Sequence, residues 1–441
     1  MKNQRPYIIG IMLIAVVALL WFFFGTYFEF GKPTLQLQED IGAIGQQKVI
    51  NLTFRDGESG LRSTLVTLTQ GNRTVALISQ QDPQRGIKEK SLSFAVNPYA
   101  LKLRNGTALL TFSAVDQSLL KNQLTVARAV QIDMLPPQIF LMNPTNNIIP
   151  GGTCVITFST SKPISMGGVW VGDRFFPGYH ILIAGKPTTV TYFALPIDAK
   201  KDRTTIRVAI RDQAGNETST NLPFLIREKK FRSDQMNLSD LFLQQKMPEF
   251  QIADPSLRGK TPIESFMAVN GVMREENLKT IQAVCRASQP RQIWQNTFLR
   301  MRNAAPMALF GDRRTYRYQG KPIGESVHFG VDLASTMRSP VESSNNGIIA
   351  FTGPLGIYGN TVIIDHGLGL LSLYAHLASV NVRKGQSVKK GDPIGYTGSS
   401  GLAGGDHLHF AIIVGGQFVN PQEWWDPHWI KDNVNTKMAA F

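Results

Sequence analysis

Histidine and acidic residues recur in the last third of the chain, in short motifs whose spacing suits a single site. The motifs are HFGVD, with His328 and Asp332, LYAHL, with His376, and GDHLHF, with His407 and His409. Strand-forming sequences such as NTVIID and HFAIIV surround them. Because side chains two or four positions apart on a strand share one face, His407 and His409 can point into one cleft, as can His328 and Asp332.

These residue types match the ligands of a catalytic zinc ion. Catalytic zinc takes three protein ligands and keeps one coordination position for water. Two neutral imidazoles and one carboxylate leave a net positive charge at the ion, which acidifies that water and polarises a carbonyl oxygen. Two further imidazoles could accept the water proton or stabilise the oxyanion. The pattern therefore predicts a Zn²⁺-dependent hydrolase with one zinc ion in its catalytic domain.

Residues 321–425 hold all of these motifs and resemble the lysostaphin/LytM-type zinc metallopeptidases, which cut peptide bonds in bacterial peptidoglycan. The resemblance implies that His328, Asp332 and His409 are the zinc ligands. It leaves His376 and His407 as the catalytic pair that assists water attack and stabilises the oxyanion, and which of the two is the base stays open. The text VRKGQSVKKGDPIG at 382–395 also resembles this family, with its lipoyl-type β-hairpins.

Residues close to the motifs have simpler expected roles. His366, in DHGLG, is expected to stabilise a turn beside the site, and the TrpTrp pair at 424–425 is expected to close the domain. Tyr374 is two positions from His376 and should share its face, so it could line the groove together with Asn360.

An alternative function follows from the same resemblance. Some relatives have lost zinc ligands and act only as activators of other hydrolases. The chain could therefore be a zinc-binding but non-hydrolytic LytM-like activator or scaffold that regulates a cell-wall amidase. The five residues of the pattern are all present, which favours the enzyme. The sequence leaves open which peptidoglycan bond is cut.

The elements upstream of the motifs predict a mainly β protein. Residues 30–228 contain short runs rich in β-branched residues, such as VINLTF and CVITFST, broken by Gly, Asn, Asp and Pro. Similar segments recur about 100 residues apart, which suits two Ig-like β-sandwich modules at 30–132 and 133–228. No catalytic pattern is visible in them, so we expect spacers or docking surfaces for envelope protein partners.

Residues 229–320 are expected to form a helical linker before the antiparallel β metallopeptidase domain at 321–441. Thr261, Pro262 and Glu264 have the spacing of an N-cap, a first-turn proline and a capping box. An upstream segment can cover the cleft in relatives of this type, and this linker is placed to do so. Cys285 ends the predicted helix, and an oxidising compartment would permit a disulfide with Cys154.

The N-terminus predicts the location of the protein. Residues 6–28 carry no charge and are long enough to cross a hydrocarbon core of about 30 Å. Lys2 and Arg5 precede them, so we expect residues 1–29 to be a cytoplasmic tip and a transmembrane anchor. The bulky WFFFGTYFEF end argues against a cleaved signal peptide. The sequence thus predicts a single-pass membrane protein with a cytoplasmic N-terminus and a periplasmic or extracytoplasmic body.

Composition agrees with a folded, exported protein. The 441 residues are 43% hydrophobic and 18% charged, which excludes a disordered chain. The net charge is +14, although residues 321–441 hold eight basic and nine acidic residues, so the excess lies upstream. Such positive charge favours binding to anionic lipid head groups or to anionic wall polymer. Export argues against nucleic acid as a partner. We therefore expect a membrane-anchored zinc endopeptidase that hydrolyses cross-links or stem peptides of peptidoglycan.

Overall fold

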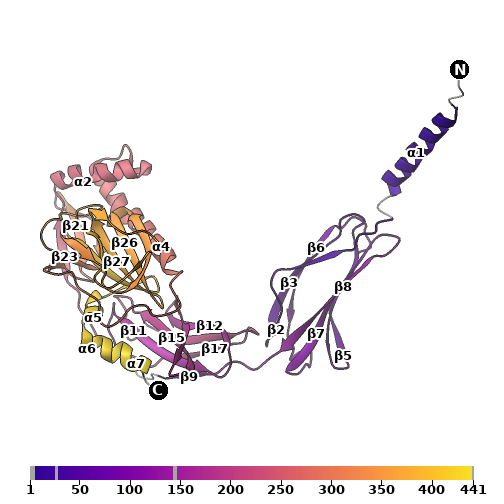
Figure 1. Ribbon diagram of the computed structural model, residues 1–441, viewed down its shortest axis with the longest axis horizontal. Helices are drawn as coiled ribbons and strands as arrows, with labels where there is room; N and C mark the ends of the chain where they lie inside the picture. The colour runs from indigo at the N-terminus through magenta and orange to yellow at the C-terminus, as the bar shows by residue number, and fades with distance from the viewer. Residues whose placement is uncertain (1–4, 25–27, 143–146, 440–441) are drawn as a thin grey trace. The chain divides into compact units, whose positions relative to one another are not determined.

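The computed structural model describes residues 5–24, 28–142 and 147–439, with side chains of the first helix described only for residues 9–19. The chain forms two compact units. The first contains Met1–Pro137, Lys162–Ser165 and Arg211–Thr218, and the second contains the rest. Both are built mainly from β-strands, as the sequence predicted (Figure 1).

The first unit is a sandwich of two sheets. One sheet has the strand order β1-β3-β6 and the other β2-β8-β7-β4-β5. Alternate residues of each strand point inward, as in β3, where Ile50, Leu52 and Phe54 are buried. The bounds are β1 Thr34–Leu37, β2 Ala43–Ile44, β3 Lys48–Arg55, β4 Leu61–Gln70, β5 Arg73–Gln81, β6 Glu89–Val96, β7 Gly106–Asp116 and β8 Gln123–Ile132.

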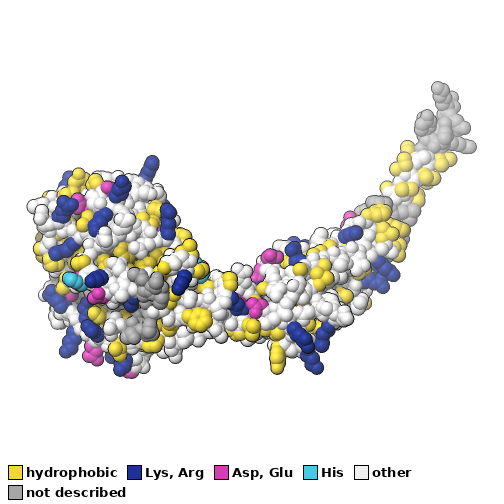
Figure 2. Space-filling view, turned by 60° about the horizontal axis from the view of Figure 1, so that its bottom comes forward, with side chains coloured by type: hydrophobic (Ala, Val, Ile, Leu, Met, Phe, Trp, Pro, Cys, Tyr) yellow, Lys and Arg dark blue, Asp and Glu magenta, His cyan; other side chains and the backbone are white. Residues whose placement is uncertain are grey.

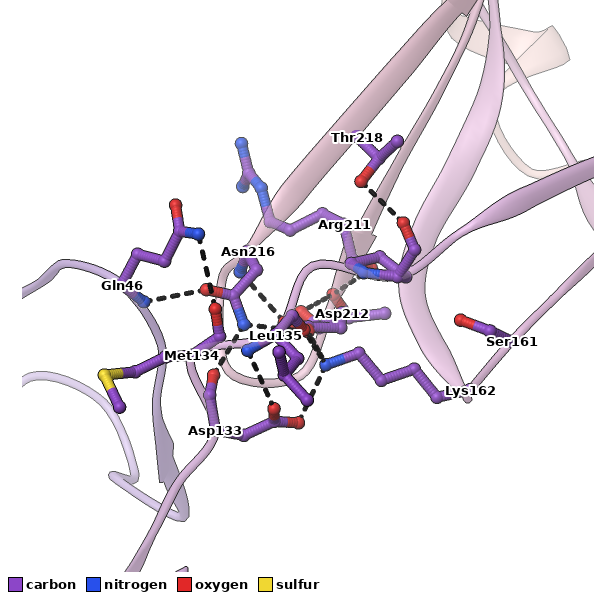
Figure 3. A network of polar contacts seen from close by, with 12 residues as sticks. Gln46, Asp133, Met134, Leu135, Ser161, Lys162, Arg211, Asp212, Asn216 and Thr218 are labelled. Atoms are coloured by element: carbon purple, nitrogen blue, oxygen red, sulfur yellow. Dashed lines mark hydrogen bonds and ion pairs between the residues drawn. The ribbon is translucent and has the colours of Figure 1, made fainter. Parts of the chain in front are cut away.

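A half-buried ion network completes the first unit (Figure 3). Lys162 Nζ lies 2.8 Å from Asp133 Oδ2 and 2.6 Å from Asp212 Oδ2. Burial opposes the charge of Lys162, but the two carboxylates outweigh it and raise the pKa of the lysine. Asn216, in the turn after β16, accepts a hydrogen bond from the Gln46 N–H at 2.7 Å. The network fixes the two turns of residues 162–165 and 211–218 within this unit.

The second unit begins with another two-sheet sandwich. Its sheets have the orders β14-β15-β11-β9 and β13-β12-β16-β17, and β10 and β18 form a short parallel pair. The bounds are β9 Ile139–Leu141, β10 Asn147–Ile148, β11 Thr153–Thr160, β12 Ile164–Val171, β13 Arg174–Pro177, β14 Tyr179–Ile183, β15 Lys186–Ala194, β16 Ile206–Asp212, β17 Glu217–Asn221 and β18 Leu225–Ile226.

The C-terminal domain is an eight-stranded sheet with the order β20-β23-β31-β27-β26-β25-β29 and with β32 beside β31. Its central strands are buried on both faces, and every residue of β27 and β31 is buried. A smaller sheet has the order β24-β30-β28. The bounds are β23 Val331–Ala334, β24 Pro340–Glu342, β25 Gly347–Pro354, β26 Asn360–Gly367, β27 Leu370–Leu377, β28 Ser379–Val380, β29 Ser387–Val388, β30 Pro393–Tyr396, β31 Leu408–Val414 and β32 Gln417–Val419.

The predicted helical linker is helical only in part. Its helices are α2 Asp240–Ala253, α3 Pro262–Ala268 and α4 Arg274–Cys285, and the capping box of Thr261 and Glu264 is present at the start of α3. Residues 229–320 also contain β19 Ser233–Asn237, β20 Ala305–Ala308 and β21 Arg313–Tyr318. β20 pairs with β23, and β21 lies between β19 and β22 Lys321–Val327. β19 and β20 depend on partners distant in sequence, but β21 and β22 form a local hairpin across residues 319–320, which the helical interpretation of this segment missed.

The predicted transmembrane helix is not supported. A helix, α1, covers Arg5–Phe24, but residues 1–4 and 25–27 of the predicted tip and anchor lie outside the described residues. In the part of the chain that the structure describes, no helix has both the length and the apolar character needed to cross a bilayer.

The last helices pack on the second sandwich within the second unit (Figure 1). They are α5 Pro421–Trp425, α6 Pro427–Ile430 and α7 Thr436–Ala439. Trp424 is fully buried, 6.2 Å from the ring of Tyr192 and 5.5 Å from that of Trp294. Cys154 and Cys285 are both buried, but the disulfide that we considered between them is not formed. Cys154 Sγ lies instead 3.7 Å from Lys437 Nζ.

Glu423 is a buried carboxyl at this junction. It accepts a hydrogen bond from the Thr153 N–H at 2.8 Å, and the indole of Trp424 donates to the hydroxyl of the same threonine. Burial raises the pKa of Glu423 from its ordinary value of 4.5 to about 8, although the Thr153 N–H and the charge of Lys229 oppose the shift. The folded protein therefore holds a proton here in neutral solution.

Replacing Glu423 by glutamine is expected to stabilise the protein in alkaline solution and to change little in acid. The folded pKa exceeds the unfolded one, so the stability contributed by this proton is fully present below 4.5 and is lost as pH rises through about 8. This shift corresponds to about 5 kcal/mol of unfolding free energy at most. Urea unfolding of wild type and Glu423→Gln at about pH 5, 7 and 9 measures the difference.

Glu249→Gln is the matched control, because this carboxylate is 56% exposed. The difference in stability between wild type and Glu423→Gln should widen with pH, while that for the control should stay near zero. A constant difference for Glu423→Gln would show that its carboxyl titrates alike in the folded and unfolded states.

Surface charge does not mark a site on the face drawn in Figure 2. Lys and Arg side chains are spread over both units there, and acidic side chains lie among them. The chemistry of the protein therefore has to be sought in the arrangement of individual residues in the C-terminal domain.

Candidate metal centre and active site

Asp332 and His409 face each other across two neighbouring strands. They are register partners in the antiparallel pair of β23 and β31. His328 lies in the loop just before β23, and its Nε2 atom is 2.9 Å from Asp332 Oδ1 and 3.0 Å from His409 Nδ1. His409 Nδ1 is in turn 2.9 Å from Asp332 Oδ1. Three side chains thus bring one atom each to a common point.

These contacts cannot all be ordinary hydrogen bonds. His328 Nδ1 lies 2.9 Å from the carbonyl oxygen of Leu309, which can only accept, so the neutral ring carries its proton there and a lone pair on Nε2. His409 Nε2 is buried and has no hydrogen-bond partner among the described residues. Lone pairs that converge in this way suit a cation, and two imidazoles with one carboxylate suit zinc. The Leu309 carbonyl is the kind of outer partner that orients a ligating histidine.

Asp332 is ionised in this arrangement. Burial alone would raise its pKa, but the close approach of the His328, His407 and His409 imidazoles holds the pKa well below the usual value. Arg314 adds an ion pair, with its guanidinium nitrogen 3.3 Å from Asp332 Oδ2. The oxygen that faces the histidines is therefore Oδ1, and the other oxygen is occupied by arginine.

His376 and His407 form a second pair beside this cluster, with ring centres 4.8 Å apart. His376 Nδ1 donates to the Ser400 carbonyl at 2.8 Å, and His407 Nδ1 donates to the Gly405 carbonyl at 2.8 Å. Both rings therefore keep Nε2 as the atom that can accept a proton. The structure brings all five predicted residues together, and the division of roles among them stays a prediction.

The two rings of this pair differ in pKa. Burial lowers the pKa of His376 to about 3, so this ring is neutral in ordinary solution. Burial acts in the same direction on His407, but the nearby carboxylate of Asp332 outweighs it and raises the pKa. The rings thus differ in their ability to carry a proton, which is the property that separates an acid from a base.

A β-bulge aims the His376 side chain. The register between β26 and β27 shifts between Asn360 and Val362, and His376 has a φ of +62°. Bulges and positive φ values in residues other than Gly are uncommon, and both gather beside active sites. The bulge also breaks the simple alternation of β27, so the expectation that Tyr374 shares a cleft with His376 is wrong. Tyr374 instead bonds Ser344.

The other residues near the motifs have structural contacts. Asn360 Nδ2 donates to the Leu377 carbonyl at 3.0 Å and does not line the cavity. His366 is buried, donates to the Asn346 carbonyl and accepts from the Ser372 hydroxyl, and burial lowers its pKa to about 4. These contacts suit the predicted support of a turn, but the turn lies at the end of the β26–β27 hairpin away from His376, so its expected place beside the site is wrong.

A cavity of about 380 Å³ opens over the five residues. Part of its wall comes from the linker, since the lining includes residues 236–239 and Phe242 of α2. Two contacts hold this wall in place. On α2, Lys246 Nζ donates to the Ser399 carbonyl at 2.5 Å, and on α4, which follows in the same linker, Asn277 Oδ1 accepts from the Ile357 N–H at 2.9 Å. The segment of residues 236–242, which we call the cover, therefore lies at the rim of the cavity over the His-Asp-His cluster.

Sequence reasoning missed three contributors to the site. Arg314 bonds Asp332, Tyr358 places its ring 5.6 Å from that of His409, and Leu309 orients His328 through its backbone. None of these three residues lies at the spacing of a known motif. A contact made by a backbone carbonyl also does not depend on the residue type, so the sequence cannot reveal it. The text RRTYRY before the first motif was the only available hint for Arg314.

Comparison with known proteins gives the domain a family. Residues 326–421 match the model of Peptidase family M23. The DD-carboxypeptidase/endopeptidase Mpg of Neisseria meningitidis is 38% identical over 121 residues, which cover 27% of this chain and 28% of Mpg. The peptidoglycan DD-endopeptidase ShyA of Vibrio cholerae is 40% identical over 101 residues, 22% of this chain and 24% of ShyA.

A relative with a different printed role is also similar. The murein hydrolase activator EnvC of Escherichia coli is 36% identical over 109 residues, which cover 25% of this chain and 26% of EnvC. The chain thus spans about a quarter of the length of each of these curated relatives.

Proposed function

Because residues 326–421 are a Peptidase family M23 domain, we propose that this protein is a zinc-dependent endopeptidase that hydrolyses peptide cross-links of peptidoglycan. The observation that carries the proposal is the convergence of His328 Nε2, Asp332 Oδ1 and His409 Nδ1 within 3.0 Å of one another, beside two further imidazoles. The names of Mpg and ShyA support a DD-peptide bond as the substrate.

The chain's own residues supply most of the chemistry in this proposal. Zinc held by His328, Asp332 and His409 would act as a Lewis acid toward water and the scissile carbonyl. His376 and His407 keep Nε2 available, so one ring would accept the proton of the attacking water, and the other, when it carries a proton on Nε2, would donate to the developing oxyanion. The carbonyls that bond their Nδ1 atoms fix both rings in this tautomer.

Release of soluble muropeptides from purified peptidoglycan tests the proposal. The full chain, loaded with zinc, should convert cross-linked dimers to monomers, and the product masses identify the bond. A chelated sample should release nothing. A folded and zinc-loaded protein that leaves both these dimers and a short soluble cross-linked peptide intact would exclude the endopeptidase.

The second candidate is a non-hydrolytic activator of a cell-wall amidase, which the similarity to EnvC favours. In this case peptidoglycan would stay intact with the protein alone and would be cleaved at the amide bond once an amidase is added. The same assay with and without a purified amidase distinguishes the two functions, because an endopeptidase releases its products in both.

For the location we propose anchoring at residues 6–28 with the body outside the cytoplasm, and the support is the charge-free sequence itself. Alkaline carbonate extraction of membranes and protease treatment of spheroplasts test this. Retention in the membrane together with digestion of the body is expected. Release by carbonate, or protection from protease, would contradict it.

We further propose that the cover restricts access of polymeric substrate. Phe242→Ala is expected to raise the rate on intact peptidoglycan about 3- to 10-fold, because losing one packed ring weakens closure by about 1 kcal/mol. The rate on a short soluble cross-linked peptide should change less. Leu241→Ala, on the same helix but 63% exposed, is the matched control. Equal or lower rates for Phe242→Ala on both substrates would exclude a restricting cover.

A further inference from the structure

Three carboxylates are buried together in the first unit. Glu29 precedes β1, Asp56 follows β3, and Asp116 ends β7, and their exposed fractions are 4%, 3% and 0%. One oxygen from each lies within 4.8 Å of the others. Buried acidic residues are normally paired, so three in one place need a compensating charge.

The contacts of these carboxylates are with neutral donors. Glu29 Oε2 accepts from the Ser59 N–H at 2.8 Å, and Asp56 Oδ2 accepts from the Gly60 N–H at 2.6 Å. Asp116 Oδ1 and Oδ2 accept from the Ser118 hydroxyl and the Asn122 amide, each at 2.8 Å. Hydrogen bonds of this kind orient the carboxylates but do not neutralise their charge.

Two buried oxygens at this place have no partner among the described residues. They are Asp56 Oδ1 and the hydroxyl oxygen of Ser59, and both residues are at least nine-tenths buried. Ser59 is the residue whose main chain bonds Glu29, so its hydroxyl belongs to the same cluster. An unsatisfied buried oxygen costs about 1–3 kcal/mol. Burial, together with the charges of Glu29 and Asp116, also raises the pKa of Asp56.

We propose that Glu29, Asp56 and Asp116, with the Ser59 hydroxyl, bind a calcium ion. The donors are all oxygens, which hard divalent cations prefer, whereas the His-Asp-His cluster of the second unit offers nitrogen. Ca²⁺ accepts several protein carboxylates in a flexible shell, while Mg²⁺ demands near-ideal octahedral geometry and keeps most of its waters. Two thirds of the carboxylate charge would be neutralised.

Bound calcium would join three stretches of the chain that are distant in sequence. Glu29 leads into the first strand, residues 56–60 form the loop after β3, and residues 116–122 form the loop after β7. Asn122 already donates to the Glu29 carbonyl at 2.8 Å, so the amide holds Glu29 beside the last of these loops. The ion would thus hold Glu29, which precedes β1, against the loops that follow β3 and β7 of the first sandwich.

The test is calcium binding by the full chain with its zinc site loaded. Isothermal titration and equilibrium dialysis with radioactive calcium should give one Ca²⁺ per chain, and calcium should raise the melting temperature of wild type. Asp56→Asn should bind at least about 100-fold more weakly. The Asp56→Asn side chain keeps an oxygen that can accept from the Gly60 N–H, and the substitution removes one of three like charges. In the absence of calcium this variant should therefore be at least as stable as wild type.

Two further variants keep the outcome decisive. Asp40→Asn changes a carboxylate of the same unit that is 87% exposed and should bind calcium like wild type. His409→Ala should also retain calcium, which separates this site from the zinc site and from the proposed function. If Asp56→Asn fails to fold, terbium luminescence of wild type, displaced by calcium, replaces it. No calcium binding by wild type at about 5 mM, binding of Mg²⁺ alone, or unchanged binding in a folded Asp56→Asn would overturn the proposal.

Discussion

Replacing His409 by alanine is expected to abolish both zinc binding and release of muropeptides. His409 Nδ1 lies 2.9 Å from Asp332 Oδ1 and 3.0 Å from His328 Nε2, so its removal leaves two of the three proposed ligands. Loss of an outer partner of a metal site already costs about 10- to 100-fold in affinity or activity, and loss of a ligand should exceed this. We expect less than about a thousandth of the wild-type rate.

Plasma mass spectrometry of the purified variant measures zinc content, and the muropeptide assay measures the rate. His428→Ala is the matched control, because this histidine is exposed and outside the motifs. Circular dichroism checks that His409→Ala is folded, since the ring is buried and its loss leaves space next to Tyr358. A folded variant that keeps a full zinc content would remove His409 from the ligand set.

Replacing His376 is expected to lower the turnover number about 10²- to 10⁴-fold while zinc content stays that of wild type. The ring lies outside the three-atom cluster, and its Nδ1 atom is committed to the Ser400 carbonyl. Its pKa of about 3 keeps it neutral, so Nε2 can accept a hydrogen bond throughout the neutral range. KM should change much less than the turnover number.

Asparagine is the informative substitution at this position. His376 has a φ of +62°, and Asn is among the residues other than Gly that tolerate this region best. Its amide can still donate toward Ser400, so a purely structural role would survive in His376→Asn. A variant with near wild-type turnover would show that the ring is structural and would leave His407 alone to handle protons.

Part of the site could be predicted because Asp332 and His409 lie on neighbouring strands, while His328 and His407 lie just before these strands at the predicted spacings. His407 and His409 are two positions apart at the start of β31, and Asp332 pairs directly with His409. The mainly β fold was equally visible in runs of β-branched residues. The error at Tyr374 arose where the alternation fails, at the bulge that turns His376 toward the cavity.

Most of the features that were not predicted depend on contacts between segments that are distant in sequence. Arg314 reaches Asp332 because β21 pairs with β22, the strand that leads into the loop before β23, and Glu423 is buried because Thr153 lies against the last helices. Residues 305–308 and 313–318 form strands because β20 pairs with β23 and β21 pairs with β22, although β20 is short and β21 is polar. The hydrophobic periodicity of a short segment does not indicate which other segment it will contact.

The cover is also held by a strand pairing that determines how it can move. Ser233 pairs in parallel with Arg313, Asn237 pairs with Arg317, and the Leu238 N–H extends the pairing to the Arg317 carbonyl at 2.8 Å. The chain between β19 and β21, which contains most of the cover, is therefore attached at both ends to the same small sheet. A cover that lifts from the cavity remains tethered at an effective concentration on the order of millimolar. Reclosure of the cover is then a first-order process whose rate does not depend on protein concentration. A free peptide with the sequence of the cover would compete for the cavity only at concentrations on the order of millimolar.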